Sequence, residues 1–138
     1  MTNEDIFEFV SKSDLAVFGT VSPEGKPQSA LVGIAVTRDL EIIFDTLNTT
    51  RKYLNLSANS RCSIAVGWQG ETTLQYEGEA REPSGSELVR YKEVYFKKWP
   101  TCIPHELWPG IAYFVVRPKW IRYSDYNQTP PLIQEFSF

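Results

Sequence analysis

The sequence predicts a mainly β protein, a β-barrel with short helices built on six antiparallel strands. Three observations lead to this prediction. Apolar residues recur with a period of two along six separate segments, and turn residues such as Pro23 and Gly25 separate those segments. The segments with a helical period between them are brief. A closed or nearly closed barrel would also leave few sheet edges exposed.

The first half of the chain begins with a short helix and continues as three strands. Thr2 can cap the helix, and acidic residues follow it in the first turn. Pro23 and Gly25 then supply the two conformations that a tight turn needs. The expected elements are a strand at Leu15–Val21, a turn at Ser22–Pro27, a return strand at Gln28–Thr37, a turn at Arg38–Asp39 and a strand at Leu40–Thr46.

The second half alternates two helices with the remaining strands. Asn48 or Thr49 is expected to cap the first of these helices, and the pattern from Ser84 to Glu87 has the form of a capping box. The expected elements are a helix at Thr49–Ala58, strands at Arg61–Trp68 and Glu71–Glu82 joined by a turn at Gln69–Gly70, a helix from Ser84 to about Lys98, and a strand at Ile111–Tyr123 interrupted at Pro118.

Composition limits the function classes. The 138 residues are 42% hydrophobic and 22% charged, so we expect one folded domain over residues 1–138. Fourteen basic against seventeen acidic residues give a net charge of −3, which disfavours general nucleic-acid binding. The sequence has no apolar run of the ~20 residues that a membrane span needs, and the acidic start Met1–Asp5 does not resemble a signal peptide. We therefore expect a cytoplasmic protein without a membrane partner.

The stretch from Phe44 to Lys52 has the most chemical content. It ends a strand and begins a helix with hydroxyl side chains followed by two adjacent cations, Arg51 and Lys52. Free backbone N–H groups at a helix start attract anions, and Arg binds phosphate with a planar fork. On these residues alone two interpretations stay open: an anion site, or a solvated helix start with two ordinary surface cations.

The order of these motifs resembles the pyridoxamine 5′-phosphate oxidase-like, FMN-binding split-barrel family. The resemblance covers about Leu15 to Tyr123. The segments that carry it are Thr20–Pro27, Ile43–Thr46, Thr50–Lys52 and Tyr76–Arg81.

This resemblance implies a six-stranded antiparallel split barrel of the FMN-binding type, and a homodimer that holds two FMN molecules at the subunit interface. The strand from Ser29 to Ile34 would lie along the flavin ring and touch it partly through backbone groups. Asp45 and Thr46 would lie beside the cofactor, and the residues at the helix start would hold the phosphate. The cofactor-binding residues implied are Ser29, Leu31, Val32, Gly33, Phe44, Asp45, Thr46, Thr50, Arg51, Lys52, Thr73, Gln75, Trp120 and Arg122.

Four of these positions match the family less closely. Thr73 stands where some members have Gln, and Gln75 projects to the same face and could take its place. Trp120 matches an aromatic residue that approaches the flavin from the partner subunit, with Arg122 beside it. A core or dimer-interface role for Trp120 is an equal alternative.

The function that the resemblance implies is that of an FMN-dependent oxidoreductase with a small-molecule substrate or an electron donor such as NAD(P)H. No triad or paired carboxylates suggest a catalytic side chain, so we expect none. Relatives that oxidise vitamin B6 phosphates carry an Arg-x-His element near the C-terminus. The stretch after Trp120 has no His, so we do not expect that substrate. The alternatives are a non-catalytic flavin carrier or sensor, the same fold with F420 or haem, and an OB-like barrel that binds single strands.

Several reactive residue types have simpler interpretations. His105, the one histidine, has no Ser or Cys motif to activate. Cys62 is expected in the core, whereas Cys102 is expected in a loop and is open to oxidation. The two cysteines lie outside any metal-ligand spacing, so no metal site is expected. The aromatic stripe of Tyr91, Tyr95 and Trp99 indicates either packing within the chain or a dimer interface.

Overall fold

The computed structural model describes residues 1–68 and 70–138. In this part of the chain one antiparallel, curled sheet has the order β2-β1-β5-β6-β7-β4-β3, with β8 paired to β7. The strands are β1 (Leu15–Val21), β2 (Pro27–Gly33), β3 (Ala35–Val36), β4 (Ile42–Leu47), β5 (Arg61–Val66), β6 (Thr72–Arg81), β7 (Ile111–Asp125) and β8 (Leu132–Ser137). The helices are α1 (Asn3–Ser11), α2 (Arg51–Ala58), α3 (Gly85–Lys98) and the 3₁₀ helix η1 (Pro100–Leu107).

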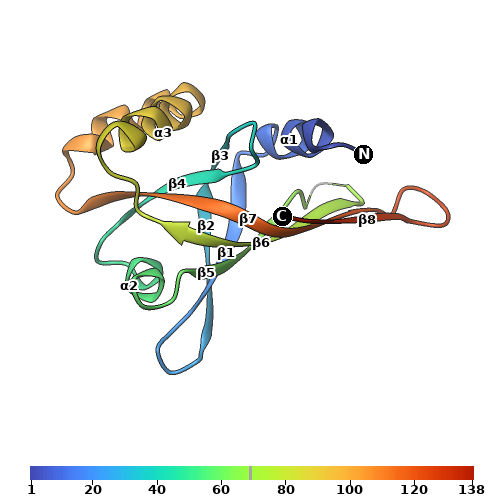
Figure 1. The fold of residues 1–138 in the computed structure, drawn as a ribbon, viewed down its shortest axis with the longest axis horizontal. Helices are drawn as coiled ribbons and strands as arrows, with labels where there is room; N and C mark the ends of the chain where they lie inside the picture. Colours follow the sequence, from blue (N-terminus) through green and yellow to red (C-terminus); the bar gives the residue numbers. More distant parts are fainter. Residues whose placement is uncertain (69) are drawn as a thin grey trace.

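The predicted mainly β, antiparallel split barrel is confirmed, with two differences. The described strands number eight rather than six, and the sheet ends at β2 and β3 rather than closing. Figure 1 shows α3 on one side of β4 and α2 on the other. Among the described residues no helix is long and apolar enough to cross a membrane. The turn predicted at Gln69–Gly70 includes Gln69, which lies outside the described residues.

The expected return strand at Gln28–Thr37 is divided at Ile34. β2 pairs with β1 as far as Gly33, and β3 pairs with β4. Between them the Ile34 N–H donates to the Asp14 carbonyl at 3.1 Å, and the Trp99 indole Nε1 donates to the Ile34 carbonyl at 2.9 Å. The chain therefore changes partner strand at Ile34, and this change bends the sheet.

β7 continues through Pro118, so the predicted interruption there is wrong. The irregularity lies instead in its pairing with β6, whose register shifts between Glu77 and Gly78. This shift leaves Lys119 without a partner on β6, in the manner of a β-bulge, a site where a strand tolerates proline. β8 was not predicted, and it runs beside the C-terminal part of β7 (Figure 1).

The main core fills the concave side of the sheet. Phe44 lies at its centre, with ring centroids 4.5 Å from Phe18 and 5.4 Å from Phe114. The Tyr76 hydroxyl is 2.8 Å from the Leu40 carbonyl and 3.0 Å from the carbonyl of Val116, so this buried polar group has partners. Each large apolar side chain buried in this way contributes about 1.5–3 kcal/mol to folding. Cys62 belongs to this core, as expected.

A second core lies on the convex side, between α3 and the strands β3, β4 and β7. Tyr91 and Tyr95 are buried there against Ile43, Tyr113 and Val115. Of the two interpretations of the aromatic stripe, the structure shows packing within the chain for these two tyrosines. A dimer interface cannot use them, because their own sheet already covers them.

The capping box predicted at the start of α3 does not form. Ser84 makes no side-chain cap hydrogen bond, and Glu87 pairs with Arg81 instead. Gly85 adopts a positive φ of 61°, which directs the backbone away from capping-box geometry. The cap predicted at Thr2 is confirmed, and Asp5 completes a capping box there.

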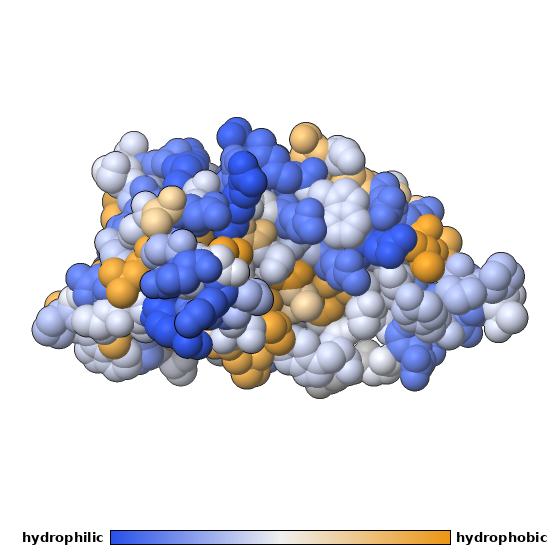
Figure 2. All heavy atoms as spheres, turned by 90° about the horizontal axis from the view of Figure 1, so that it is seen from below, coloured by the Kyte–Doolittle hydropathy of each residue, from blue (hydrophilic) through white to orange (hydrophobic). Residues whose placement is uncertain are grey.

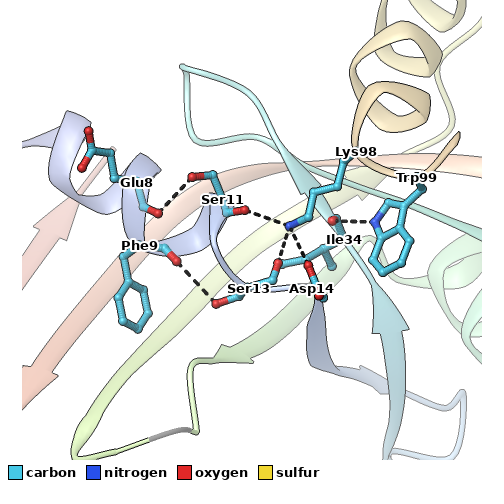
Figure 3. Close-up of polar contacts among 8 residues, drawn as sticks. All are labelled: Glu8, Phe9, Ser11, Ser13, Asp14, Ile34, Lys98 and Trp99. Atoms are coloured by element: carbon cyan, nitrogen blue, oxygen red, sulfur yellow. Dashed lines mark hydrogen bonds and ion pairs between the residues drawn. The ribbon is translucent and has the colours of Figure 1, made fainter.

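The end of α3 is tied to two other parts of the chain (Figure 3). The Lys98 ammonium donates to the carbonyls of Ser11 and Ser13 and lies 3.7 Å from an Asp14 carboxylate oxygen. A cation near the last carbonyls of α1 is favourable because a helix C-terminus carries partial negative charge. These interactions hold Trp99 over the junction between β2 and β3.

Candidate functional site

The turn between β4 and α2 is built by two hydroxyl side chains. Thr50, rather than the expected Asn48 or Thr49, is the N-cap of α2 and accepts a hydrogen bond from the Tyr53 N–H at 3.4 Å. The Thr50 hydroxyl donates to the Leu47 carbonyl at 2.9 Å and lies 2.8 Å from the Thr46 hydroxyl. Thr46 and Thr50 therefore fix the direction in which the first turn of α2 points.

Arg51 and Lys52 form that first turn. Arg51 is exposed and Lys52 is half-buried. Among the described residues neither cation lies within ion-pair distance of an acidic group. Burial lowers the pKa of Lys52, and the more distant Asp45 carboxylate only partly offsets this effect. Two cations at a helix start, with no carboxylate at ion-pair distance among the described residues, form a site that an anion would stabilise.

A buried amide links this helix to the sheet. Asn55 is 4% exposed, and its Nδ2 donates to the Thr20 hydroxyl and to the Gln28 side-chain oxygen, both at 2.9 Å. Asn55 follows Arg51 by one helical turn, so the two lie on the same side of α2. The sequence analysis did not predict a role for Asn55. The signal that could have indicated one is a polar residue on the inner face of a short helix.

A groove of about 820 Å³ crosses the convex side of the sheet, and Thr20 and Gln28, the two partners of Asn55, line part of it. Residues of β1, β2, β5 and β6 form most of its wall, and Lys119 and Trp120 of β7 complete it. Viewed from the side of the β1–β2 turn, the face in Figure 2 is hollowed near its middle, where apolar residues gather. Val17, Val21 and Ala65 are apolar wall residues that are exposed in this chain.

The groove brings together three of the predicted cofactor residues, Ser29, Gln75 and Trp120. The pairing of β6 with β7 explains why Gln75 and Trp120 lie close together. It places Gln75 opposite Arg122 and Glu77 opposite Trp120. Thr46, Thr50, Arg51 and Lys52 do not line the groove. Thr20 and Gln28 do, so the Asn55 link connects α2 to its edge.

Two further predicted residues lie on β6 and β7 outside the groove. Thr73 is exposed and lies opposite Ser124. The Nε of Arg122 lies 3.2 Å from a Glu135 carboxylate oxygen of β8. Arg122 therefore already has a counter-charge within its own chain.

The predicted residues of β2 point to both sides of the strand. Leu31 is 58% exposed, and Ser29 is exposed on the same side, whereas Val32 is buried in the main core. Gly33 lies under Trp99, where an added Cβ would be 3.2 Å from the indole ring. β2 ends the sheet, so backbone groups along its free edge have no ladder partner in the described sheet.

The last two predicted residues, Phe44 and Asp45, point to opposite sides of β4. Phe44 is fully buried in the main core, which leaves only its backbone to contact a ligand. Asp45 points toward α3 and η1, where it lies near Tyr95, Cys102 and His105. Burial raises the pKa of Asp45, while the Tyr95 hydroxyl, His105 and Lys52 act in the opposite direction.

Comparisons with known proteins assign the chain to a family. Residues 2–125 match the family model described as pyridoxamine 5′-phosphate oxidase. A pyridoxine/pyridoxamine 5′-phosphate oxidase of Bacteroides thetaiotaomicron is 33% identical over 92 residues, which are 66% of this chain and 41% of that protein. The chain thus spans less than half the length of this curated relative.

Solved structures agree on the fold. A haem-binding protein of Mycobacterium smegmatis has a TM-score of 0.84 at 14% identity, over 99% of this chain and 58% of that one. The haem storage protein HutZ of Vibrio cholerae has a TM-score of 0.75 at 14% identity, over 97% and 92%. From the family model, supported by the split-barrel fold, the chain belongs to the pyridoxamine 5′-phosphate oxidase family.

Proposed function

We propose that the chain is an FMN-binding oxidoreductase that works as a homodimer. The observation that carries this proposal is the pair Arg51 and Lys52 at the start of α2, which lack a carboxylate partner among the described residues. Family membership adds support, because flavin binding is usual in this family. The substrate, the catalytic turnover and the cytoplasmic location stay predictions.

The phosphate of FMN fits the start of α2. It is an anion of about −1.5 to −2 at neutral pH with three acceptor oxygens. Arg51 offers a planar donor fork, Lys52 a compact charge, and the helix start free N–H groups. The cost of holding the half-buried Lys52 charged falls when an anion lies beside it, so binding relieves an existing penalty.

The flavin ring is proposed to lie against β2. The free edge of this strand offers backbone donors and acceptors around Leu31 to Gly33, and the exposed side of Leu31 offers apolar surface. Donors directed at the ring edge that gains negative charge on reduction would raise its potential. FMN would supply the hydride and electron chemistry, and the chain would bind and orient it.

A second subunit accounts for the groove. The groove residues Gln75 and Trp120 do not line the phosphate site of their own chain, and the exposed apolar residues around them need a cover. A homodimer would place the partner subunit's Trp120 against the ring and bury this apolar surface. The Glu135 contact of Arg122 means that Arg122 must exchange partners before it can serve the same ring.

The experiment that tests the phosphate site compares FMN with riboflavin, which lacks the phosphate. Wild type should bind FMN more tightly, and the double variant Arg51→Ala/Lys52→Ala should bind both ligands alike. Removal of each charge-assisted hydrogen bond to the phosphate should cost about 1.5–3 kcal/mol, or roughly 10-fold to 150-fold in affinity. Flavin fluorescence quenching measures both affinities.

The matched control removes two cations elsewhere. Lys12 and Lys97 are exposed, and the double variant Lys12→Ala/Lys97→Ala changes the net charge by the same amount. It should keep the preference for FMN. Equal FMN affinity in wild type and in the Arg51/Lys52 variant would refute the phosphate site, whereas equal loss in both variants would indicate a general charge effect.

Three alternatives keep the same fold. A flavin carrier or sensor would bind FMN in the same way, but NADH or NADPH would not reduce the bound FMN under anaerobic conditions. Haem is the second alternative, favoured by the two structurally similar haem proteins and by a single half-buried histidine, His105, that could serve as an axial ligand. F420 would lack the haem absorption band and is separated from FMN by chromatography.

A further inference from the structure

Three potential metal ligands from distant parts of the sequence meet beside the second core. Asp45 belongs to β4, and Cys102 and His105 belong to η1. One donor atom from each side chain lies within 4.8 Å of the other two, and all three residues are half-buried. Neither the linear spacing of the cysteines nor the flavin interpretation accounts for this grouping.

The local structure explains why the three side chains converge. A 3₁₀ helix has three residues per turn, so Cys102 and His105 project from the same side of η1. Asp45 alternates with Phe44 and Thr46 along β4 and so points out of the main core toward η1. The His105 ring stacks on Trp108 at 3.8 Å between centroids, which restricts its rotation.

A buried hydroxyl without a partner provides a second, independent observation. Tyr113 is 6% exposed and lies directly opposite Asp45 in the β4–β7 ladder. Among the described residues its hydroxyl has no hydrogen-bond partner, which is costly for a buried polar group. A bound ion that carries a water molecule would give this hydroxyl a partner.

The electrostatics of the cluster favour a cation. The pKa of Tyr113 is raised to about 12, first by burial and then by the negative charge of Asp45. The Asp45 carboxylate therefore gives this half-buried cluster a negative potential, which a divalent ion would balance.

We propose that Asp45, Cys102 and His105 bind a divalent transition-metal ion of the zinc type, with one coordination position left open. One sulfur, one nitrogen and one oxygen donor form a set that Zn²⁺ accepts, and three protein ligands with an open position are typical of its non-structural sites. Tetrahedral coordination at these bond lengths separates donors by about 3.3–3.7 Å, so the side chains need only a small approach.

Binding changes the protonation of one ligand. The Cys102 thiol loses its proton to solvent as its sulfur coordinates the ion, while His105 binds as the neutral ring and Asp45 as the carboxylate. About one proton is released per ion bound. The half-buried position leaves the ion a route from solvent.

Two neighbouring cations oppose the ion. Lys52 interacts with Asp45, and Lys92 lies 2.9 Å from a Glu106 carboxylate oxygen and over the Tyr113 ring. Lys92 is already neutralised by Glu106, so Lys52 is the main competitor. Lys52→Met should therefore tighten metal binding, whereas a general loss of structure would weaken it.

The test uses the reduced full chain, treated with a chelator and titrated with Co²⁺ as a spectroscopic substitute for Zn²⁺. Difference spectra should show a thiolate-to-Co²⁺ charge-transfer band in the near ultraviolet that saturates at one Co²⁺ per chain and disappears when Zn²⁺ is added. Difference spectra also remove the absorption of any bound chromophore. The proposal goes beyond the flavin site and does not depend on it.

Matched variants identify the ligands. Cys102→Ser should abolish the charge-transfer band, and His105→Ala should weaken Co²⁺ binding at least 10-fold, with circular dichroism showing that each variant is folded. Cys62→Ala removes the other cysteine, which lies in the main core, and should keep the band. Absence of the band in folded wild type, its persistence in Cys102→Ser, or its loss in folded Cys62→Ala would each overturn the proposal.

Discussion

Replacement of Lys52 by methionine separates the effect of the Lys52 charge on folding stability from its effect on FMN affinity. Methionine retains an unbranched side chain of similar length but carries no charge. Burial lowers the pKa of Lys52 below its usual 10.5, so the folded ligand-free protein holds this charge at a cost. Lys52→Met should therefore raise the stability of the ligand-free protein while weakening its affinity for FMN.

The magnitudes follow from the exposure of the side chain. Lys52 is only half-buried, so screening by solvent limits the gain in stability to a few tenths of a kcal/mol. The loss in FMN affinity should be larger, roughly 10-fold to 150-fold, because a charge-assisted hydrogen bond of about 1.5–3 kcal/mol disappears. The two effects have opposite signs, which a general disturbance of the fold cannot produce.

The pH dependence adds a second check. Below the folded-state pKa of Lys52 the folded and unfolded chains both carry the charge, and the cost is fully present. As pH rises through that pKa toward 10.5, the folded chain releases the proton first and the cost falls. The stability difference between Lys52→Met and wild type should thus be largest at neutral pH and shrink on approach to pH 10.5.

Urea unfolding and flavin fluorescence quenching measure the two effects, and Lys98→Met is the control. Burial also lowers the pKa of Lys98, but its ammonium donates to the carbonyls of Ser11 and Ser13. Its removal should lower stability by about 1 kcal/mol. A loss of stability in Lys52→Met like that of Lys98→Met, or unchanged FMN affinity, would refute the reasoning.

The remaining predictions concern residues that position the site. Thr50→Ala removes the N-cap of α2 and should cost about 1 kcal/mol in urea unfolding, with weaker FMN binding; equal stability would contradict the cap. Asn55→Ala leaves the Thr20 and Gln28 side chains without their shared donor and should cost about 1–3 kcal/mol; a neutral effect would mean that water replaces the amide. Gly78→Ala would place a Cβ 2.4 Å from the Arg117 carbonyl oxygen and should cost at least about 2 kcal/mol, whereas Gly25→Ala, which meets no atom within 4 Å, should cost less despite its positive φ. If Gly78→Ala had the melting temperature of the wild type, β7 would have to shift away from the new Cβ without loss of stability, which would contradict this prediction.

Local alternation predicted much of the fold. The bounds of β1 were predicted at Leu15–Val21, because apolar residues alternate there between turn residues. β8 was missed because it follows two prolines and alternates only between half-buried and exposed positions along the end of β7. The break at Ile34 was missed because Leu31–Val36 is apolar at every position except Gly33, so the sequence does not mark where the chain changes partner strand.

The candidate site was predictable where its residues are neighbours in the sequence. Thr50, Arg51 and Lys52 form one helix start, so their grouping needed no tertiary information. Asn55 meets Thr20 and Gln28 only because α2 lies on the sheet, and Asp45 meets Cys102 only because η1 lies beside β4. A helix face such as that of Tyr91 and Tyr95 looks the same whether its own sheet or another subunit covers it.

The visible spectrum of the purified protein, with identification of the released ligand, tests the central claim most directly. The proposal predicts the two absorption bands of a flavin, one FMN released per chain on denaturation, and a dimer by size in solution. A colourless protein that fails to take up added FMN, or one that carries a haem band and releases haem, would contradict it.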